Sequence, residues 1–182
     1  MRYYFTSIFI FIYSCLPLVA QLHDNVWLFS DGGQFSAGLS FTSEGEAIIV
    51  PVETDLDLFN SASSICDVNG NLLLFTDGCN IYNADSEIIT NGEGINIGET
   101  WDNYCDIGFG YPQVLQSSLF LNWPENPARY ILFHRKLTFE SSPDGGIDVI
   151  TAPLYYSLIS YEENTDGEVV EKNVILYDDL PL

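Results

Sequence analysis

Short apolar runs separated by polar turn residues lie over Ser63–Ala84, where the pattern predicts three short strands. Two dipeptides, Asn69-Gly70 and Asp77-Gly78, separate these strands. Both are typical of type I′ hairpins, in which the two central residues take positive φ. The segment between them, Leu72–Thr76, is apolar except for its last residue. We therefore expect a three-stranded antiparallel meander.

Counting outward from two-residue turns gives the register of this meander and the faces of its strands. Cys66 then faces Leu73, which faces Tyr82. In the next row Ser64 faces Phe75, which faces Asn80. The opposite face holds Ile65, Leu72, Leu74, Cys79 and Ile81. Both faces are largely apolar, so we expect the sheet to be covered on both sides, as in stacked sheets.

Further strand patterns lie on both sides of the meander. Before it are Asn25–Phe29, Phe35–Phe41 and Ala47–Val52. After it are Ser118–Trp123, Arg129–Lys136, Pro153–Tyr161 and Glu168–Leu176, with a polar excursion around Ser141–Gly146. No segment shows helical periodicity over three turns. The second set matches one four-stranded propeller blade in size.

The predicted fold class is all-β, with antiparallel meanders stacked as a partial β-propeller. A β-sandwich is the alternative. These strands are too few to close a ring of the usual four to eight blades. We therefore expect residues 21–182 to form a single all-β propeller-like region that is a fragment of a longer domain, and isolated expression to give oligomers or aggregates through uncovered apolar faces.

A long connection, Asp85–Ser117, contains many glycines and little apolar alternation. A connection of this length usually serves a function or is held by a cross-link. Cys66 and Cys79 fall on opposite faces of the meander, two strands or ~9.6 Å apart. A disulfide needs Cα atoms within about 7 Å. The prediction is therefore a Cys79–Cys105 disulfide, which leaves Cys66 as a buried thiol.

The N-terminal segment, residues 1–20, has the pattern of a secretory signal peptide. Arg2 precedes an apolar run, and the small residue Ala20 comes before Gln21. The run is shorter and more interrupted than a membrane-spanning helix requires, so no transmembrane segment is expected. A lipoprotein signal ending at Cys15 is a further alternative. The pattern indicates a secreted protein, or one on the outer cell surface.

The chain is strongly acidic, with 26 Asp and Glu against five Lys and Arg and a net charge of −21. This charge repels phosphates and anionic membrane surfaces, so nucleic-acid binding is excluded as an expected function. Solubility in a salty medium explains the acidity. Calcium binding is the alternative. Asp67–Asn71 resembles the start of a calcium loop, but the sixth position counted from Asp67 is Leu72 where such a loop needs glycine, so we expect no cofactor.

Several motifs, in order, carry a family resemblance. They are Asn25–Phe29, Ser64–Asp67, Asn69–Leu73, Phe75–Gly78, Asn83, Asn91–Gly94, Pro112-Gln113, Tyr130–His134, Leu154–Ser157 and Glu168–Asn173. Together they resemble large secreted proteins that bacteria export through the type IX secretion system. The resemblance implies an N-terminal β-propeller-like region followed by a C-terminal sorting domain, which this sequence lacks. The motifs are turns and strand cores, so the resemblance implies no catalytic residue.

Catalytic and metal-binding patterns are weak, and we expect no enzyme activity and no metal site. Nucleophilic catalysis needs a base, and the chain has two histidines, His23 and His134. Alternation places His134 on a strand face beside Tyr130 and Leu132, which is typical of a packed side chain. No nucleophile-elbow motif is present. Paired carboxylates for glycoside hydrolysis cannot be singled out among so many acids.

Aromatic residues cluster in the second half of the long connection, beside carboxylates and amides. The candidate ligand-binding residues are Trp101, Asp102, Tyr104, Phe109 and Tyr111. Aromatic faces beside hydrogen-bonding groups suit sugar rings. The alternative is that these aromatics form a small core beneath a disulfide-linked loop.

Three functions follow from the sequence. The first is a secreted or surface-exposed interaction or scaffold module without catalytic activity, whose partner is an unidentified protein or polysaccharide. The second is a carbohydrate-binding module that uses the aromatic loop at 101–111. The third is the front part of a propeller hydrolase, whose active site would be completed by further blades.

Overall fold

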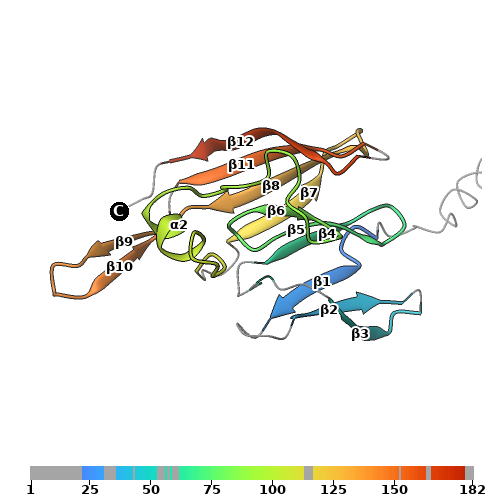
Figure 1. Cartoon of the computed structure of the whole chain (residues 1–182), viewed down its shortest axis with the longest axis horizontal. Coiled ribbons are helices and arrows are strands. Elements are labelled where there is room, and N and C mark those ends of the chain that lie inside the picture. Colours follow the sequence, from blue (N-terminus) through green and yellow to red (C-terminus); the bar gives the residue numbers. More distant parts are fainter. Residues whose placement is uncertain are drawn as a thin grey trace, which may run out of the picture.

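The computed structural model of the chain describes residues 22–30, 36–42, 44–52, 56, 58, 62–112, 117–151, 153–162 and 165–178. The predicted signal peptide, residues 1–20, lies outside these ranges. The described part is mostly β, with antiparallel sheets and one short helix, which confirms the all-β expectation (Figure 1). Within the described residues, no helix has the length and apolar character needed to cross a membrane.

Three sheets form the body of the molecule. The first sheet has the order β1-β2-β3, the middle sheet β4-β5-β6, and the third sheet β12-β11-β8-β7. Their strands are β1 (Val26–Ser30), β2 (Ser36–Phe41), β3 (Ala47–Pro51), β4 (Ser63–Cys66), β5 (Leu72–Thr76), β6 (Ile81–Asn83), β7 (Ser118–Asn122), β8 (Arg129–Arg135), β11 (Leu154–Ser160) and β12 (Glu168–Tyr177).

The sheets stack face to face, with the middle sheet between the other two (Figure 1). Ile65, Leu74 and Ile81 of the middle sheet pack against the third sheet, in a core that includes Phe120, Tyr130, Leu132, Ile159 and Val169. From its other face, Phe75 and Tyr82 pack with Leu28 of β1 and with Leu58. The prediction that both faces of the meander are covered is thus confirmed.

The predicted register of the meander is partly wrong. Ser64 faces Phe75 as expected, but Cys66 faces Leu72 because β5 has an extra residue at this step. The bulge exchanges the two leucines, so Leu73 packs in the core beside the third sheet, and Leu72 packs beside the first. Phe75 faces Tyr82 instead of Asn80, a slip of two residues that preserves the face of every side chain in β6.

The two turns differ from the predicted type I′ geometry. Gly70 and Gly78 have φ of 85° and 83°, but neither Asn69 nor Asp77 has positive φ. In the first turn a carboxylate oxygen of Asp67 accepts the backbone N–H groups of Asn69 and Asn71. Burial opposes ionisation of Asp67, but hydrogen bonds from these two asparagines outweigh it and hold the pKa below its usual value. The Asp67–Asn71 segment therefore forms a turn in which the Asp67 side chain hydrogen-bonds to the backbone.

The long connection is well tied to the sheets, contrary to the structureless segment that its composition suggested. Its first half runs alongside β6. The N–H of Ile89 donates to the carbonyl of Ile81, and the N–H of Ile81 donates to the carbonyl of Gly92. Ile89 and Ile95 enter the core between the middle and third sheets. Thr90 also pairs with the first residue of β12. Its second half contains the helix α2 (Glu99–Tyr104).

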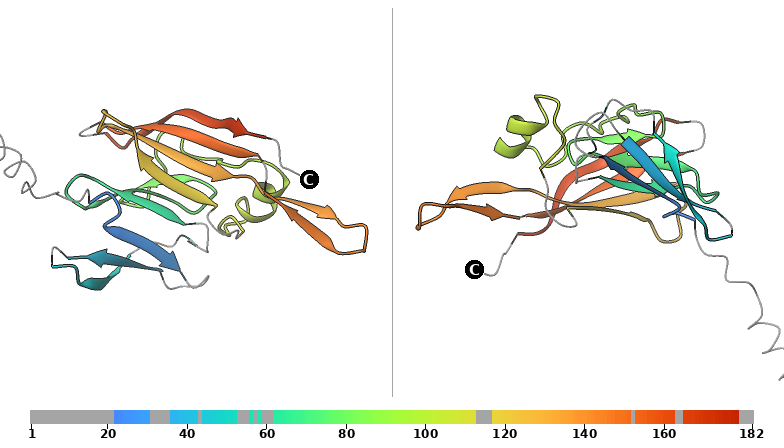
Figure 2. Two further views of the ribbon diagram at one scale, coloured as in Figure 1. Left: turned by 180° about the vertical axis from the view of Figure 1, so that it is seen from behind. Right: turned by 90° about the horizontal axis from the view of Figure 1, so that it is seen from below.

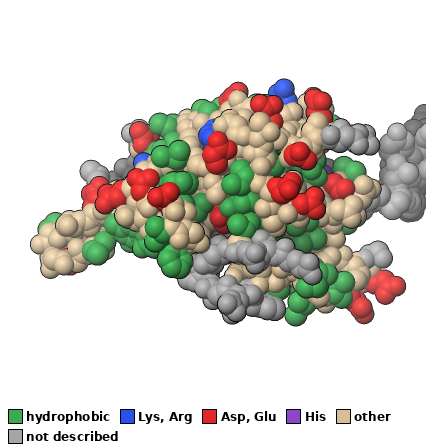
Figure 3. All heavy atoms as spheres, in the orientation of Figure 1, with side chains coloured by type: hydrophobic (Ala, Val, Ile, Leu, Met, Phe, Trp, Pro, Cys, Tyr) green, Lys and Arg blue, Asp and Glu red, His purple; other side chains and the backbone are tan. Residues whose placement is uncertain are grey.

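A two-stranded ribbon, β9 (Thr138–Ser141) and β10 (Ile147–Ile150), projects from the third sheet between β8 and β11 (Figure 2). The polar excursion predicted near Ser141–Gly146 is the tip of this ribbon. Phe139 pairs with Val149, and Glu140 with Asp148, so one face is apolar and the other acidic. On the face of the molecule drawn in Figure 3, acidic side chains predominate over basic ones, and hydrophobic side chains lie between them.

Candidate functional site

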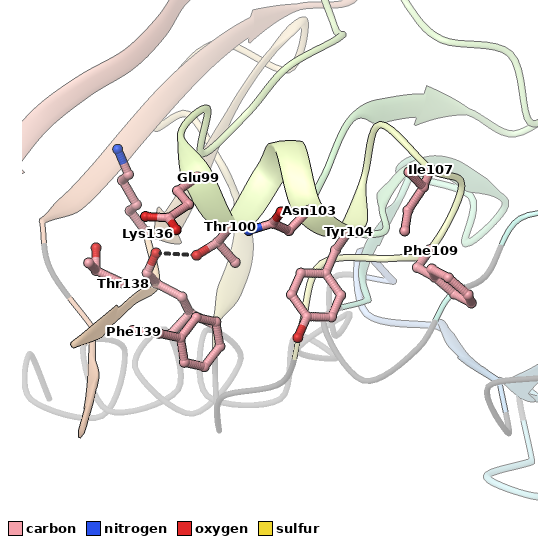
Figure 4. A pocket seen from close by; sticks show the side chains of 10 residues that line it. Glu99, Thr100, Asn103, Tyr104, Ile107, Phe109, Lys136, Thr138 and Phe139 are labelled. Atoms are coloured by element: carbon pink, nitrogen blue, oxygen red, sulfur yellow. Dashed lines mark hydrogen bonds between the residues drawn. The ribbon is translucent and has the colours of Figure 1, made fainter. Parts of the chain in front are cut away.

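A groove of about 630 Å³ lies between α2, the loop that follows it and the start of β9. Its size is typical of small-molecule sites. The rings of Tyr104, Phe109 and Phe139 lie on the same side of α2 (Figure 4). The remaining lining residues are Glu99, Thr100, Asn103, Ile107, Lys136, Leu137 and Thr138. We call this site the aromatic groove.

The disulfide Cys79–Cys105 fixes the floor of the groove, as the sequence predicted. It joins the loop between β5 and β6 to the end of α2, with the two Cα atoms 5.7 Å apart. The indole N–H of Trp101 donates to the carbonyl of Cys79 at 3.3 Å. The helix is short and has no side-chain hydrogen bond at its N-cap, so these links hold it in place.

Tyr111 and Leu137 form a small core with Cys79, against which Trp101 and Cys105 pack. The hydroxyl of Tyr111 accepts the N–H of Leu137 at 2.9 Å, and burial raises the pKa of this phenol to about 12. The hydroxyl of Thr100 donates to the carbonyl of Leu137 at 2.8 Å, which ties α2 to the start of β9 (Figure 4). The groove thus lies on a rigid, uncharged base.

The loop that carries Cys79 is organised by the buried carboxylate of Asp77. One of its oxygens accepts the N–H groups of Cys79 and Asn80, each at 2.8 Å. The other accepts the hydroxyl of Tyr82 at 2.9 Å. Burial raises the pKa of Asp77, although these hydrogen bonds favour its ionised form. Burial and the neighbouring Asp77 carboxylate together raise the pKa of Tyr82. This network explains why the loop takes four residues instead of two.

The five candidate residues from the sequence separate into two groups. Tyr104 and Phe109 line the aromatic groove. Trp101 and Tyr111 belong to the small core beneath it, which is the alternative that the sequence left open. Asp102 lies on the exposed side of α2 and is not among the lining residues.

Two contributors to the groove, Lys136 and Phe139, were missed by sequence reasoning. Both follow β8, at least 25 residues beyond the aromatic cluster, and the fold brings them beside α2. A signal was available, because apolar and polar residues alternate in Thr138–Ser141 and Ile147–Ile150 around a Pro-Asp-Gly-Gly turn. This pattern predicts a hairpin, and hence an exposed aromatic face.

His134 lies in a buried network that resembles a catalytic triad in its geometry. Its Nε2 is 3.0 Å from the hydroxyl of Ser157, and its Nδ1 is 2.7 Å from the amide oxygen of Asn96. The amide nitrogen of Asn96 donates to the carbonyl of Gly78, so its oxygen accepts the proton of Nδ1. Ser157 therefore donates to Nε2, and its oxygen accepts the N–H of Asn173.

This network is closed to substrate. Ser157 and His134 are fully buried between the middle and third sheets, and Asn96 is almost fully buried. Burial lowers the pKa of His134 to about 4, so the ring is neutral at physiological pH. The network ties the long connection to β8, β11 and β12, and its role is structural.

Within the described residues, no group of three or more His, Cys, Asp or Glu side chains is placed to hold a metal ion. Comparisons of the chain with known protein families, with characterised proteins and with solved structures find no match.

Proposed function

We propose that this chain is a non-catalytic interaction module of an exported protein. Its three sheets form part of a propeller-like scaffold, and the aromatic groove is its ligand-binding face. The observation that carries the proposal is the group of exposed rings, Tyr104, Phe109 and Phe139, held around one groove on a disulfide-linked base. Exposed aromatics fixed on a rigid base are typical of binding sites.

The order of the sheets supports a propeller-like scaffold. Each sheet begins with an edge strand, and these three strands, β1, β4 and β7, lie side by side. The hydroxyl of Ser64 in β4 donates to the carbonyl of Val26 in β1 at 2.7 Å. On its other side, the N–H of Phe120 in β7 donates to the hydroxyl of Ser63 at 3.4 Å. In a propeller the first strands of successive blades meet in this way around the axis.

A hollow of about 670 Å³ supports the same architecture. It is lined by the first strands of all three sheets, with Trp27 and Leu28 from β1, Ser64 from β4, and Leu119 and Leu121 from β7. Propellers have a central channel that their innermost strands surround. A sandwich has two layers and no such channel, so three successive face-to-face sheets favour the propeller over the alternative.

The hydrolase alternative has less support. Among the described residues the Ser157–His134 contact has the geometry of a nucleophile and base, and it is sealed in the core. A propeller hydrolase would need its catalytic residues from further sheets. We therefore favour an interaction module, with the groove as its functional face.

A carbohydrate is the ligand class that the groove suits best. Its rings offer flat apolar faces for the C–H faces of a sugar. Glu99, Asn103 and Thr138 add hydrogen-bonding groups on the same lining, and Lys136 adds one cation. This mixture of a few polar groups among aromatics is typical of sites that orient a neutral, hydroxyl-rich ligand.

Replacement of the groove rings tests this ligand class. We expect Tyr104→Ala and Phe109→Ala each to weaken retention on an immobilised polysaccharide by about tenfold, because each removes one stacking face. Affinity electrophoresis through gels that contain cellulose, xylan, chitin or mannan measures the effect. Trp123→Ala is the matched control, since this exposed aromatic lies at the opposite end of β8 from the groove. Equal retention of all variants on a gel that retains the parent would contradict the proposal.

Export is supported by the signal-peptide pattern of residues 1–20 and by the resemblance to type IX secretion cargo. The Cys79–Cys105 disulfide is consistent with an oxidising compartment. We expect the chain, when expressed with its own N-terminus in a bacterium, to be cleaved after Ala20. N-terminal sequencing of the exported protein should then begin at Gln21. An uncleaved chain retained in the cytoplasm would contradict this expectation.

A further inference from the structure

The ribbon of β9 and β10 continues the aromatic groove beyond its lining residues. Phe139 belongs to both, because its ring lines the groove on the same side of α2 as Tyr104, and its strand partner on β10 is Val149 (Figure 4). Paired residues share one face of a ribbon, so Val149 lies next to Phe139. The next pair on this face is Ser141 with Ile147. We call these two pairs the ribbon strip.

The pairs of the ribbon strip are of the kind that brings side chains close together. At the tip of the ribbon, the N–H of Ser142 donates to the carbonyl of Gly146, so these residues form a hydrogen-bonded pair. Hydrogen-bonded and non-hydrogen-bonded pairs alternate along an antiparallel ribbon. Both pairs of the strip are therefore non-hydrogen-bonded, and their side chains approach more closely. Val149 and Ile147 thus extend the apolar surface of Phe139 toward the tip.

The same geometry places polar groups along both sides of the strip. In a non-hydrogen-bonded pair, the backbone N–H and C=O groups of each residue point away from the partner strand. Those of Phe139 and Ser141 point to the outer edge of β9, and those of Ile147 and Val149 to the outer edge of β10. The strip is therefore an apolar surface, one residue pair wide, between two rows of hydrogen-bonding groups.

The apolar residues of the strip do not serve the core. Phe139 is 42% exposed, Val149 50% and Ile147 73%. None of them belongs to the three hydrophobic clusters found among the described residues. A two-stranded ribbon is only marginally stable in water without a covering layer. Apolar side chains exposed together on such a ribbon mark an interaction surface.

Charge is confined to the opposite face of the ribbon. Glu140 and Asp148 lie there, directly across from one another. Like charges in this position destabilise a ribbon, so folding alone does not account for their placement. Their separation leaves the strip without a charged side chain in a chain of net charge −21. An anionic ligand would be repelled by this surrounding charge.

We propose that the aromatic groove and the ribbon strip together bind one linear, uncharged polysaccharide, which lies along both. The role of the strip rests on the carbohydrate-binding function proposed above and specifies its ligand. The groove, at about 630 Å³, has room for a short oligosaccharide. The strip adds two residue steps of β-strand, or roughly 7 Å. The C–H faces of the sugar chain lie on the apolar surface, and hydroxyls at its edges reach the backbone groups on either side.

The dependence of affinity on chain length tests the proposal. The probes are cello-, xylo-, chito- and manno-oligosaccharides, measured by isothermal titration calorimetry. In a series that the parent chain binds, we expect the affinity to rise by about tenfold from the disaccharide to the hexasaccharide, because only the longer chain reaches the strip. Polygalacturonate, which carries a carboxylate on each sugar, should bind at least about tenfold more weakly than the neutral polymer.

Substitutions on the strip should remove the gain from chain length and nothing else. The double variant Val149→Thr/Ile147→Thr should bind the hexasaccharide about tenfold more weakly than the parent and the disaccharide equally well. Threonine is β-branched and favours strands, so the ribbon should persist. Asp148→Asn is the matched control, since Asp148 lies between these two residues with its side chain on the opposite face. It should bind both lengths as the parent does.

Tyr104→Ala separates a failure of the strip from a failure of the groove. We expect this variant to lose affinity for both lengths, because Tyr104 lines the groove. If it does so while the double variant binds the hexasaccharide like the parent, the groove stands and the strip is not part of the site. Equal affinity for all lengths, or for polygalacturonate, would also overturn the proposal. A parent chain that binds none of these sugars would remove the carbohydrate-binding function itself.

Discussion

Reduction of the Cys79–Cys105 disulfide is expected to lower the free energy of unfolding by about 3 kcal/mol, because a closed loop of this length restricts the unfolded chain. The two cysteines are 26 residues apart in sequence. The effect should be local at first. The helix α2 has six residues and depends on the disulfide and on Trp101 for its position. We therefore expect amides of residues 99–109 to exchange with solvent before those of the sheets.

Urea unfolding with and without a reducing agent measures this loss. The double variant Cys79→Ala/Cys105→Ala is the control, since it should unfold at the same urea concentration under both conditions. Cys66→Ala should retain the response to reductant, because Cys66 is a free, buried thiol. Identical unfolding midpoints for the parent chain under both conditions would contradict the expectation. Carbohydrate retention should fall with reduction, since the groove rings lose their base.

Acidification from pH 6.5 to pH 4 should cost about 3 kcal/mol of folding free energy through His134 alone. Burial lowers the pKa of this histidine from 6.5 to about 4 in the folded chain. Between these two values the unfolded chain binds the proton and the folded chain does not. The free energy of unfolding therefore rises with pH between about 4 and 6.5. Above pH 6.5 the histidine is neutral in both states, and no stability is lost through it.

The substitution His134→Gln isolates this contribution. Glutamine carries both a donor and an acceptor for Asn96 and Ser157 but does not titrate. The variant should be less stable than the parent at pH 7, because the packing of the ring against Tyr155 is lost. The difference in stability between the two proteins should shrink as pH falls toward 4. Denaturation curves at half-unit pH steps measure this difference, and a constant offset would refute the pKa argument.

The faces of most residues in the middle sheet were predictable from the sequence because side chains alternate along a strand, and Leu72 and Leu73 are exceptions because of the bulge in β5. Phe75 and Tyr82 lie on one face and Leu74 and Ile81 on the other, as alternation requires. The register was less predictable, because Asp67 and Asp77 hydrogen-bond to the backbone of their own turns. These bonds favour longer turns than the Asn-Gly and Asp-Gly dipeptides alone indicate.

The disulfide was predicted from a register that was partly wrong. The pairing was nevertheless correct because the two cysteines of the meander lie apart. Cys66 faces the first sheet, whereas Cys79 enters the small core beneath the groove. The groove itself was predictable only in part. Tyr104 and Phe109 are close in sequence. Phe139 is brought beside them by a long-range contact, in which Thr100 of α2 donates to the carbonyl of Leu137 just before β9, and no local pattern encodes this contact.

We expect the burial of Cys66 beside β1 to influence the order of oxidative folding. Its sulfur accepts the N–H of Val26 at 3.2 Å, and burial raises the pKa of the thiol. Thiolates are the species that attack disulfides, so docking of β1 onto β4 withdraws this cysteine from exchange. In a chain cleaved after Ala20, docking of the first sheet before oxidation leaves Cys79 and Cys105 as the two reactive thiols, and we expect their cross-link to form without the help of an isomerase.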